Sequence, residues 1–209
     1  MPLHILSHPL AAHIITHLRD QTTKPATFRT LAYQISLLLA IEATRAIATE
    51  EKQIATPLET ITSRVLHPQP LVVVPILRAG LGMVEGILRL MPSARVGHIG
   101  LYRDHETLEP VDYYFKVPGD VGARDFLLLD PMLATGGSLT HTAELLVRRG
   151  VDTTILVVCV LAAPEGLQRL EESGLDLHVI TAAVDERLDE RRFIVPGLGD
   201  AGDRLYGTV

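Results

Sequence analysis

The sequence has no tryptophan and a single cysteine, and only 4% of its 209 residues are aromatic. So few aromatic side chains provide no obvious platform on which the bases of a single-stranded nucleic acid could stack. The lone cysteine, Cys159, cannot form a disulfide within the chain. It lies inside the apolar run Val157-Val158-Cys159-Val160, a position that predicts a buried small side chain rather than a nucleophile.

Long hydrophobic runs and an excess of positive charge are also missing. The apolar run from Ile155 to Ala163 has the length of a strand and falls short of the ~20 residues that span a bilayer. The amino terminus carries no pattern of a secretory signal. A net charge of −6 does not provide the basic face that a sequence-independent nucleic-acid binder needs, although a few local cations could serve an anionic substrate. We therefore expect a cytoplasmic protein that binds neither membrane nor nucleic acid.

Short apolar runs that alternate with amphipathic segments predict an α/β fold. A chain that is 47% hydrophobic can bury one substantial core, so we expect one domain over residues 1–209. A hairpin is expected between Pro57 and Pro68, and an ordered, functional tail from about residue 185. The expected helices cover residues 26–49, 83–90, 139–149 and 164–174. The expected strands cover residues 71–74, 95–101, 111–117, 126–129, 154–162 and 177–184. Strands that are apolar on both faces indicate a mostly parallel central sheet flanked by helices.

The most informative segment is a buried strand that ends in an acid and a glycine-rich turn. Residues 126–138 read Phe-Leu-Leu-Leu-Asp-Pro-Met-Leu-Ala-Thr-Gly-Gly-Ser. Ligands of open α/β sheets bind beyond the carboxyl ends of the strands. Gly136 and Gly137 let the backbone approach a ligand and direct its N–H groups at it, and the dipole of the helix that follows favours a phosphate. The carboxylate of Asp130 is well placed to accept hydrogen bonds from sugar hydroxyls.

This segment contains neither the Gly-x-Gly-x-x-Gly pattern of dinucleotide-binding proteins nor the lysine of a P-loop. It resembles the signature of the type I phosphoribosyltransferases, in the form found in uracil phosphoribosyltransferases. Most other type I enzymes have a second acid where Pro131 stands here. The resemblance covers nearly the whole chain. It includes four further stretches, which are residues 74–82 (Val-Pro-Ile-Leu-Arg-Ala-Gly-Leu-Gly), 100–103 (Gly-Leu-Tyr-Arg), 107–111 (Thr-Leu-Glu-Pro-Val) and 196–203 (Pro-Gly-Leu-Gly-Asp-Ala-Gly-Asp).

The resemblance implies the type I phosphoribosyltransferase fold, with an N-terminal helical segment and a C-terminal hood that binds uracil. Arg78 and Arg103 would contact pyrophosphate, Arg103 from a mobile flap, and Gly80 would allow the backbone to approach the ligand closely. The residues implied in catalysis are Asp130, Arg103 and Asp200. The residues implied to bind phosphoribosyl pyrophosphate (PRPP) are Arg78, Arg103, Asp130, Pro131, Met132, Leu133, Ala134, Thr135, Gly136, Gly137, Ser138 and Asp200.

The hood implied by the resemblance would read the edge of uracil through backbone groups. The residues implied to bind uracil are Ile194, Gly199, Asp200 and Ala201. We expect an irregular backbone from Ile194 to Ala201, because groups outside any helix or strand ladder remain free to bind a ligand. The family usually has Gly-Tyr before the Ile/Val-Pro-Gly string, whereas this chain has Arg192 and Phe193. The aromatic ring is kept there and a hydroxyl is lost.

The activity implied by the resemblance is the transfer of the phosphoribosyl group of PRPP to uracil, which forms UMP and diphosphate in pyrimidine salvage. Mg²⁺ would bind mainly through PRPP, and the chain itself would carry no dedicated metal site. His13 and His17 have the i, i+4 spacing of a metal-binding pair, but no third ligand accompanies them. The resemblance also implies a homodimer or a larger homo-oligomer, and it makes GTP, which activates some relatives, a candidate effector.

Three other functions are compatible with such a fold. The first is a phosphoribosyltransferase for orotate or a purine, which the 196–203 string argues against. The second is an RNA-binding regulator of pyrimidine genes, which would need a basic surface that this acidic chain lacks. The third is a sugar-phosphate binding module without catalysis, and a turnover assay would distinguish it.

Overall fold

The computed structural model describes residues 1–68, 71–103, 110–119 and 124–208. Its helices are α1 (Pro9–Arg19), α2 (Pro25–Ala43), the 3₁₀ turn η1 (Thr44–Ala46), α3 (Leu81–Leu90), α4 (Gly137–Arg148), α5 (Pro164–Glu172) and α6 (Ala201–Tyr206). Its strands are β1 (Leu3–Ile5), β2 (Thr49–Ala55), β3 (Thr60–Leu66), β4 (Val72–Leu77), β5 (Arg95–Val96), β6 (His98–Arg103), β7 (Pro110–Lys116), β8 (Phe126–Leu129), β9 (Met132–Leu133), β10 (Ile155–Ala162), β11 (Leu177–Val184), β12 (Arg187–Leu188) and β13 (Ile194–Val195).

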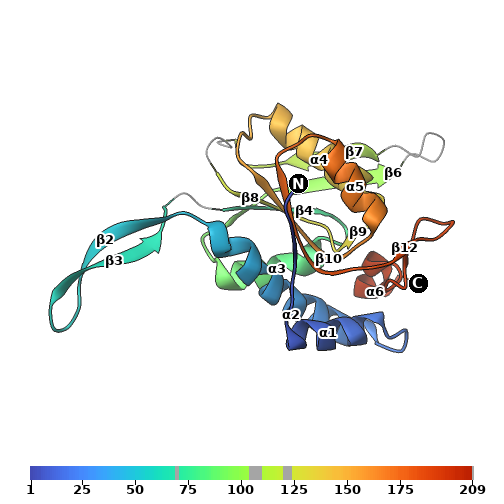
Figure 1. Cartoon of the computed structure of the whole chain (residues 1–209), viewed down its shortest axis with the longest axis horizontal. Helices are drawn as coiled ribbons and strands as arrows, with labels where there is room; N and C mark the ends of the chain where they lie inside the picture. The colour runs from blue at the N-terminus through green and yellow to red at the C-terminus, as the bar shows by residue number, and fades with distance from the viewer. Residues whose placement is uncertain (69–70, 104–109, 120–123, 209) are drawn as a thin grey trace.

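The centre of the molecule is a mostly parallel sheet with the strand order β1-β11-β10-β8-β4-β6-β7 (Figure 1). Every neighbouring pair along this path is parallel except β6 and β7, which run antiparallel. The short strands β5 and β9 add to β4 and β10. The sequence-based prediction of an α/β fold with a mostly parallel sheet is therefore confirmed.

Helices cover both faces of this sheet. In Figure 1, α1, α2 and α3 lie below it and α4 and α5 lie above it. The strands alternate between the two sides: Leu127 and Val158 pack with the lower helices, whereas Leu128 and Val157 pack with the upper ones. Cys159 is fully buried among the upper group, as its apolar neighbours predicted. Burial of both faces explains why these strands read as continuous apolar runs.

The amino-terminal quarter differs most from the expectation. The long helix ends at Ala43 rather than near residue 49, and a hairpin of β2 and β3 follows it. The hairpin begins at Thr49, before the segment between Pro57 and Pro68 in which it was expected. Its two strands project from the body of the molecule (Figure 1), and β2 is exposed along its whole length. Strands without a buried face show no apolar alternation, so the pattern could not mark their ends.

The carboxyl ends of β4, β8, β10 and β11 meet at one edge of the sheet, because these strands are parallel. The chain leaves that edge at Arg78 after β4, at Asp130 after β8 and at Asp185 after β11. The tail then forms the two-stranded pair β12–β13 and the short helix α6, which lie beside that edge (Figure 1). The tail is thus ordered, as predicted, but α6 was not expected.

Over the described residues, no helix combines the length and the apolar character that crossing a bilayer requires.

Gly166 of α5 packs directly against the loop that follows β8. A Cβ atom added at Gly166 would lie 2.4 Å from the carbonyl oxygen of Ala134 and 2.9 Å from that of Leu133. Neither of these carbonyl groups can move away from the added Cβ unless the whole loop after β8 shifts. We expect Gly166→Ala to lower the free energy of unfolding by about 1–3 kcal/mol, although alanine is ordinarily the better helix former. Urea unfolding measures the change.

Gly119→Ala is the control for this substitution, since a Cβ there meets no described atom within 4 Å. We expect its unfolding free energy to lie within about 0.5 kcal/mol of the parent. A Gly166→Ala protein as stable as the parent would show that the close contact does not constrain the loop.

Candidate functional site

The loop after β8 forms a small cradle of backbone N–H groups. Gly136 has a left-handed φ of 76° and caps α4, a conformation that strains residues with a side chain. Among the described residues, the amides of Gly136, Gly137 and Ser138 have no protein acceptor. They border a cavity of about 70 Å³ lined by Asp130 and residues 132–139. Free amides at a helix amino terminus make this cradle suited to an anion such as a phosphate.

Asp130 stands at the base of this cradle, directly after β8. One of its carboxylate oxygens accepts a hydrogen bond from the amide of Met132 at 3.3 Å. Burial raises the pKa of Asp130 to about 7, and the Met132 amide offsets only part of this rise. Burial also raises the pKa of the neighbouring Cys159 thiol to about 12. In the described structure, no cation lies beside the Asp130 carboxyl to offset the effect of burial on its pKa.

A second cavity joins this loop to the tail. It has a volume of about 200 Å³ and is lined by Ala79, Asp130, Met132, Ala134, Arg192, Phe193, Ile194, Gly199, Asp200, Ala201 and Gly202. The structure therefore brings Asp130 together with all four residues predicted to bind uracil, although about 60 residues separate them in the chain. The cavity is also lined by four residues for which the sequence predicted no such role, Ala79, Arg192, Phe193 and Gly202.

The backbone of the tail is less irregular than predicted. Ile194 opens β13 and is paired with Leu188 of β12, and Ala201 is the first residue of α6. Asp200 caps α6, because its carboxylate accepts the amide of Asp203 at 2.9 Å. The expectation of an irregular backbone over the whole of 194–201 is thus wrong at both of its ends. Within the described residues, however, the amides of Gly199 and Ala201 donate to no protein acceptor.

Arg78 lies at the junction of β4 and the tail. Its guanidinium is 3.2 Å from a carboxylate oxygen of Asp203, and its side chain is 58% exposed. The hydroxyl of Tyr206 donates to the carbonyl of Arg78 at 3.1 Å. A hydrogen bond from Thr208 and then the charge of Arg78 hold the pKa of Asp203 below its usual value. Arg78 lines neither cavity, but the next residue, Ala79, borders the second one.

Several predicted residues have other surroundings than expected. A Cβ added at Gly80 would lie 2.5 Å from the carbonyl oxygen of Leu129, so the absence of a side chain there allows the segment after β4 to pack closely against β8. Pro131 is buried and lines neither cavity, and its carbonyl accepts the amides of Val160 and Leu161. Arg103 is the last residue of β6, and its side chain, like residues 104–109, lies outside the described part.

No metal site is evident in the described part of the chain, where no group of three or more His, Cys, Asp or Glu side chains could hold an ion. The rings of His13 and His17 contact each other edge to face, with their centroids 4.6 Å apart. Asp130 is the one acid of the cradle, so a cation there would take most of its ligands from a bound substrate.

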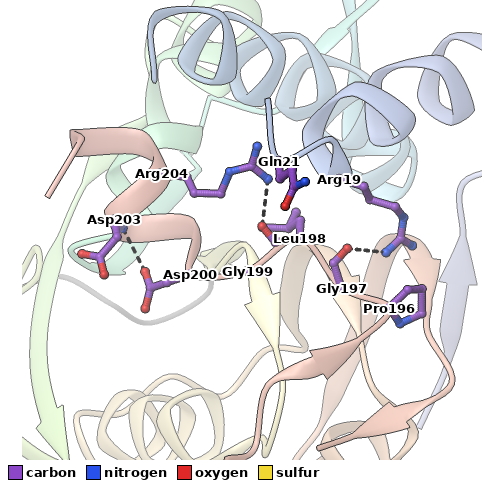
Figure 2. A pocket seen from close by; sticks show the side chains of 9 residues that line it. All are labelled: Arg19, Gln21, Pro196, Gly197, Leu198, Gly199, Asp200, Asp203 and Arg204. Carbon is purple, nitrogen blue, oxygen red and sulfur yellow. Dashed lines mark hydrogen bonds between the residues drawn. The ribbon is translucent and has the colours of Figure 1, made fainter. Parts of the chain in front are cut away.

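A third cavity borders the second one and shares Gly199 and Asp200 with it. It has a volume of about 390 Å³ and is bordered by residues of α1 and its following turn, by the tail and by α6. Figure 2 shows Arg19 and Arg204 reaching across it to the backbone of Gly197 and Leu198. Neither arginine was predicted from the sequence, because the groups that they bind are distant in the chain or belong to the backbone.

Comparison with known proteins places these features in one family. The family model described as uracil phosphoribosyltransferase matches residues 5–208. The uracil phosphoribosyltransferase of Natranaerobius thermophilus is 52% identical over 206 residues, which are 99% of this chain and 98% of that protein. The uracil phosphoribosyltransferase of Bacillus velezensis is 50% identical with the same coverage.

Solved structures share the fold. The AQ2163 protein from Aquifex aeolicus has a TM-score of 0.90 and 40% identity, with 98% of this chain and 97% of that chain covered. A hypoxanthine-guanine phosphoribosyltransferase from Bacillus anthracis has a TM-score of 0.51 at 10% identity, with 75% of this chain and 78% of that one covered. The second likeness concerns the fold alone.

The raised pKa of Asp130 predicts a pH-dependent cost in stability. The carboxyl ionises near pH 4 in the unfolded chain and near pH 7 in the folded protein. The folded state therefore binds the extra proton between these values, and stability falls as pH rises through this range. We expect Asp130→Asn to raise the free energy of unfolding by about 1–3 kcal/mol at pH 8, a range reduced because the cleft admits solvent.

The difference in unfolding free energy between Asp130→Asn and the parent should shrink towards zero as pH falls to about 4. Below that pH, Asp130 is protonated in both the folded and the unfolded state. Urea unfolding at pH 4.5, 6 and 8 measures the difference between the variant and the parent. A difference that stays constant over this range would mean that Asp130 does not titrate near pH 7.

Proposed function

The chain belongs to the uracil phosphoribosyltransferase family, and on this premise we propose that it transfers the phosphoribosyl group of PRPP to uracil, forming UMP and diphosphate. The observation that carries the proposal is the cavity shared by Asp130 and the four tail residues implied to bind uracil, Ile194, Gly199, Asp200 and Ala201. A site for this transfer must hold a phosphorylated sugar against a base. The cradle and the tail offer groups for each beside one cavity.

In this proposal the cradle binds the sugar phosphate. The free amides of Gly136, Gly137 and Ser138 receive the 5′-phosphate, and Asp130 accepts hydrogen bonds from the ribose hydroxyls. Charge builds on the ribose as pyrophosphate leaves, so the reaction needs positioning and charge stabilisation rather than a protein nucleophile. Loss of the Asp130 carboxylate would lower kcat/KM by about 10²–10³-fold, the scale for one preorganised polar group.

Mg²⁺ belongs to the proposal as a companion of PRPP. A hard cation held by pyrophosphate and sugar oxygens keeps several waters and needs only one or two protein carboxylates. Asp130 would fit that role, because it is the only acid in the cradle and burial, rather than a like charge, raises its pKa. When bound, the ion would neutralise charge on the leaving group.

The tail residues would recognise the base through its hydrogen-bonding edge. Uracil presents an acceptor, a donor and an acceptor, so two N–H groups and one carbonyl match it. The free amides of Gly199 and Ala201 can supply the two N–H groups. We expect the carbonyl to come from the same stretch of backbone, with Ile194 at its other end.

The proposal also includes assembly and regulation. We expect a homodimer or a larger homo-oligomer, and activation by GTP, as the family resemblance implies. Light scattering measures the mass of the assembly in solution. Initial rates with and without GTP test the activation.

Turnover tests the central proposal directly. The protein is incubated with labelled uracil, PRPP and Mg²⁺, and the product is separated from free base. Formation of UMP supports the proposal, and omission of Mg²⁺ in the presence of a chelator should stop it. If no UMP forms and the phosphoribosyl group is transferred to hypoxanthine or orotate instead, the substrate is a different base. Binding of PRPP without any turnover would indicate a sugar-phosphate binding module.

Arg78 and Arg103 should act on PRPP rather than on uracil. Each substitution to alanine removes a cation proposed to face pyrophosphate, so the KM for PRPP should rise by about 10–100-fold while the KM for uracil changes little. Arg89→Ala, an exposed arginine of α3, is the control. A rise confined to the KM for uracil would contradict the assignment for the arginine concerned.

Cytosine should be essentially inert as a substrate. It carries a bare nitrogen where uracil has an N–H, and an amino group where uracil has a carbonyl. Two of the three contacts then oppose like groups, and buried backbone groups are left unpaired. Sites of this kind can reject the mismatched base by ~10⁴-fold or more in kcat/KM.

A uracil with a small substituent at carbon 5 keeps the same pairing edge and should be accepted, which makes it the control for cytosine. Rates with the three bases at saturating PRPP provide the comparison. Similar kcat/KM values for cytosine and uracil would rule out recognition by a fixed backbone.

A further inference from the structure

The tail is held in place by a buried ion pair outside the proposed uracil cavity. The guanidinium of Arg19, at the end of α1, meets the carboxylate of Asp185 in a two-pronged contact with N–O distances of 2.7 and 2.5 Å. The side chain of Asp185 is only 4% exposed. Bidentate pairs of this kind fix the relative orientation of their partners as well as their distance. The end of α1 is thereby joined to the first residue after β11.

Both partners also bind the backbone of Gly197. The amide of Gly197 donates to Asp185 at 2.8 Å, and its carbonyl accepts from Arg19 at 2.7 Å. Gly197 has a φ of 62°, and a Cβ there would lie 2.0 Å from the carbonyl oxygen of Ile194. The ion pair thus holds a tight turn that connects Ile194 to Gly199, two of the residues proposed to read uracil.

Arg204 of α6 holds the next residue from the same side. It donates to the carbonyl of Leu198 at 2.8 Å, to the carbonyl of Asp20 at 2.6 Å and to that of Leu18. Its guanidinium also lies 4.5 Å from the centre of the Phe28 ring. Burial lowers the pKa of Arg204. The carbonyls of Gly197 and Leu198 are therefore both occupied by arginines (Figure 2).

These hydrogen bonds occupy backbone groups of Gly197 and Leu198, whereas other backbone groups of the tail are left to face the Asp130 cavity. Gly197 uses its amide and its carbonyl on Asp185 and Arg19, and Leu198 uses its carbonyl on Arg204. The amides of Gly199 and Ala201 donate to no protein acceptor in the described structure, and both residues border the Asp130 cavity. Neither Arg19 nor Asp185 lines that cavity.

We propose that Arg19 and Asp185 are positioning residues for the base: their ion pair orients the turn at Gly197 so that the amides of Gly199 and Ala201 face the substrate. The proposal rests on uracil as the base in the proposed function. A displacement of about 1 Å at a reacting geometry can cost ~10²-fold, so a pair outside the cavity can still control how the base is bound.

Steady-state kinetics of Arg19→Gln and Asp185→Asn test this role. Each variant should raise the KM for uracil by about 10–100-fold and change the KM for PRPP by less than about threefold, because the cradle after β8 does not depend on the pair. Arg19→Lys keeps the charge and one donor, so it should recover part of the loss. The double variant should be no worse than the poorer single one, as expected for residues that act as a unit.

Arg148→Gln is the matched control, since it removes an arginine from the surface pair with Glu144, whose N–O distance is 3.4 Å. We expect it to leave both KM values unchanged. Where Arg19→Gln does not fold, Arg19→Lys carries the test alone, with a smaller but still uracil-specific rise. Equal rises for uracil and PRPP in these variants would overturn the proposal.

Amide hydrogen exchange on the free proteins gives a readout that does not depend on the substrate. Exchange of the Gly197 amide, which donates to Asp185, should be at least about tenfold faster in Arg19→Gln or Arg19→Lys than in the parent, while exchange in α4 stays the same. Unchanged exchange of the Gly197 amide would also overturn the proposal. A parent protein that shows no turnover of uracil refutes the proposed function instead, and the exchange result then decides the role of the pair.

Discussion

The site depends on the parallel pairing of β4, β8, β10 and β11. Parallel pairing places the carboxyl ends of these strands at one edge, so Arg78, Asp130 and Asp185 all leave the sheet on the same side. Because helices cover both faces of the sheet, this edge is where loops can gather without displacing the core. The tail closes over it, and Gly202 of α6 lies beside Ala79.

Backbone amides without a protein acceptor in the described structure are the main groups that this edge offers to a ligand. The cradle offers the amides of Gly136 to Ser138, and the tail offers those of Gly199 and Ala201. Amides fixed by a helix start or by a clamped turn cannot rotate to suit a different ligand, as a side-chain amide can. In the proposed site, the left-handed φ of Gly136 and the ion pair at Gly197 would therefore fix the direction of these amides, although neither provides a reactive group.

The sequence predicted the elements whose two faces are both buried. The strands at 126–129 and 177–184 were predicted with their observed ends, because polar residues bound each apolar run. The exposed strand β2 lacks such a pattern, so its hairpin was expected too late in the chain. Helix α6 was missed although Asp200 is a capping residue and Gly207 follows its end. For the site, local motifs identified Asp130 and the tail, but Arg19 and Asp185 are 166 residues apart and no local pattern connects them.

Asp130 and Asp185 occupy equivalent places and differ in their partners. Each follows the carboxyl end of a strand that neighbours β10, and each carboxyl is largely enclosed by protein. Asp185 has Arg19 and the amide of Gly197 beside it, so its hydrogen-bonding capacity is committed to holding the tail. In the described part of the chain, Asp130 has one long bond from an amide and no cation beside it, so burial raises its pKa to about 7. The same fold pairs the buried acid Asp185 with an arginine. A carboxyl left, among the described residues, without such a partner stays available to a ligand that brings its own positive charge or hydroxyl groups.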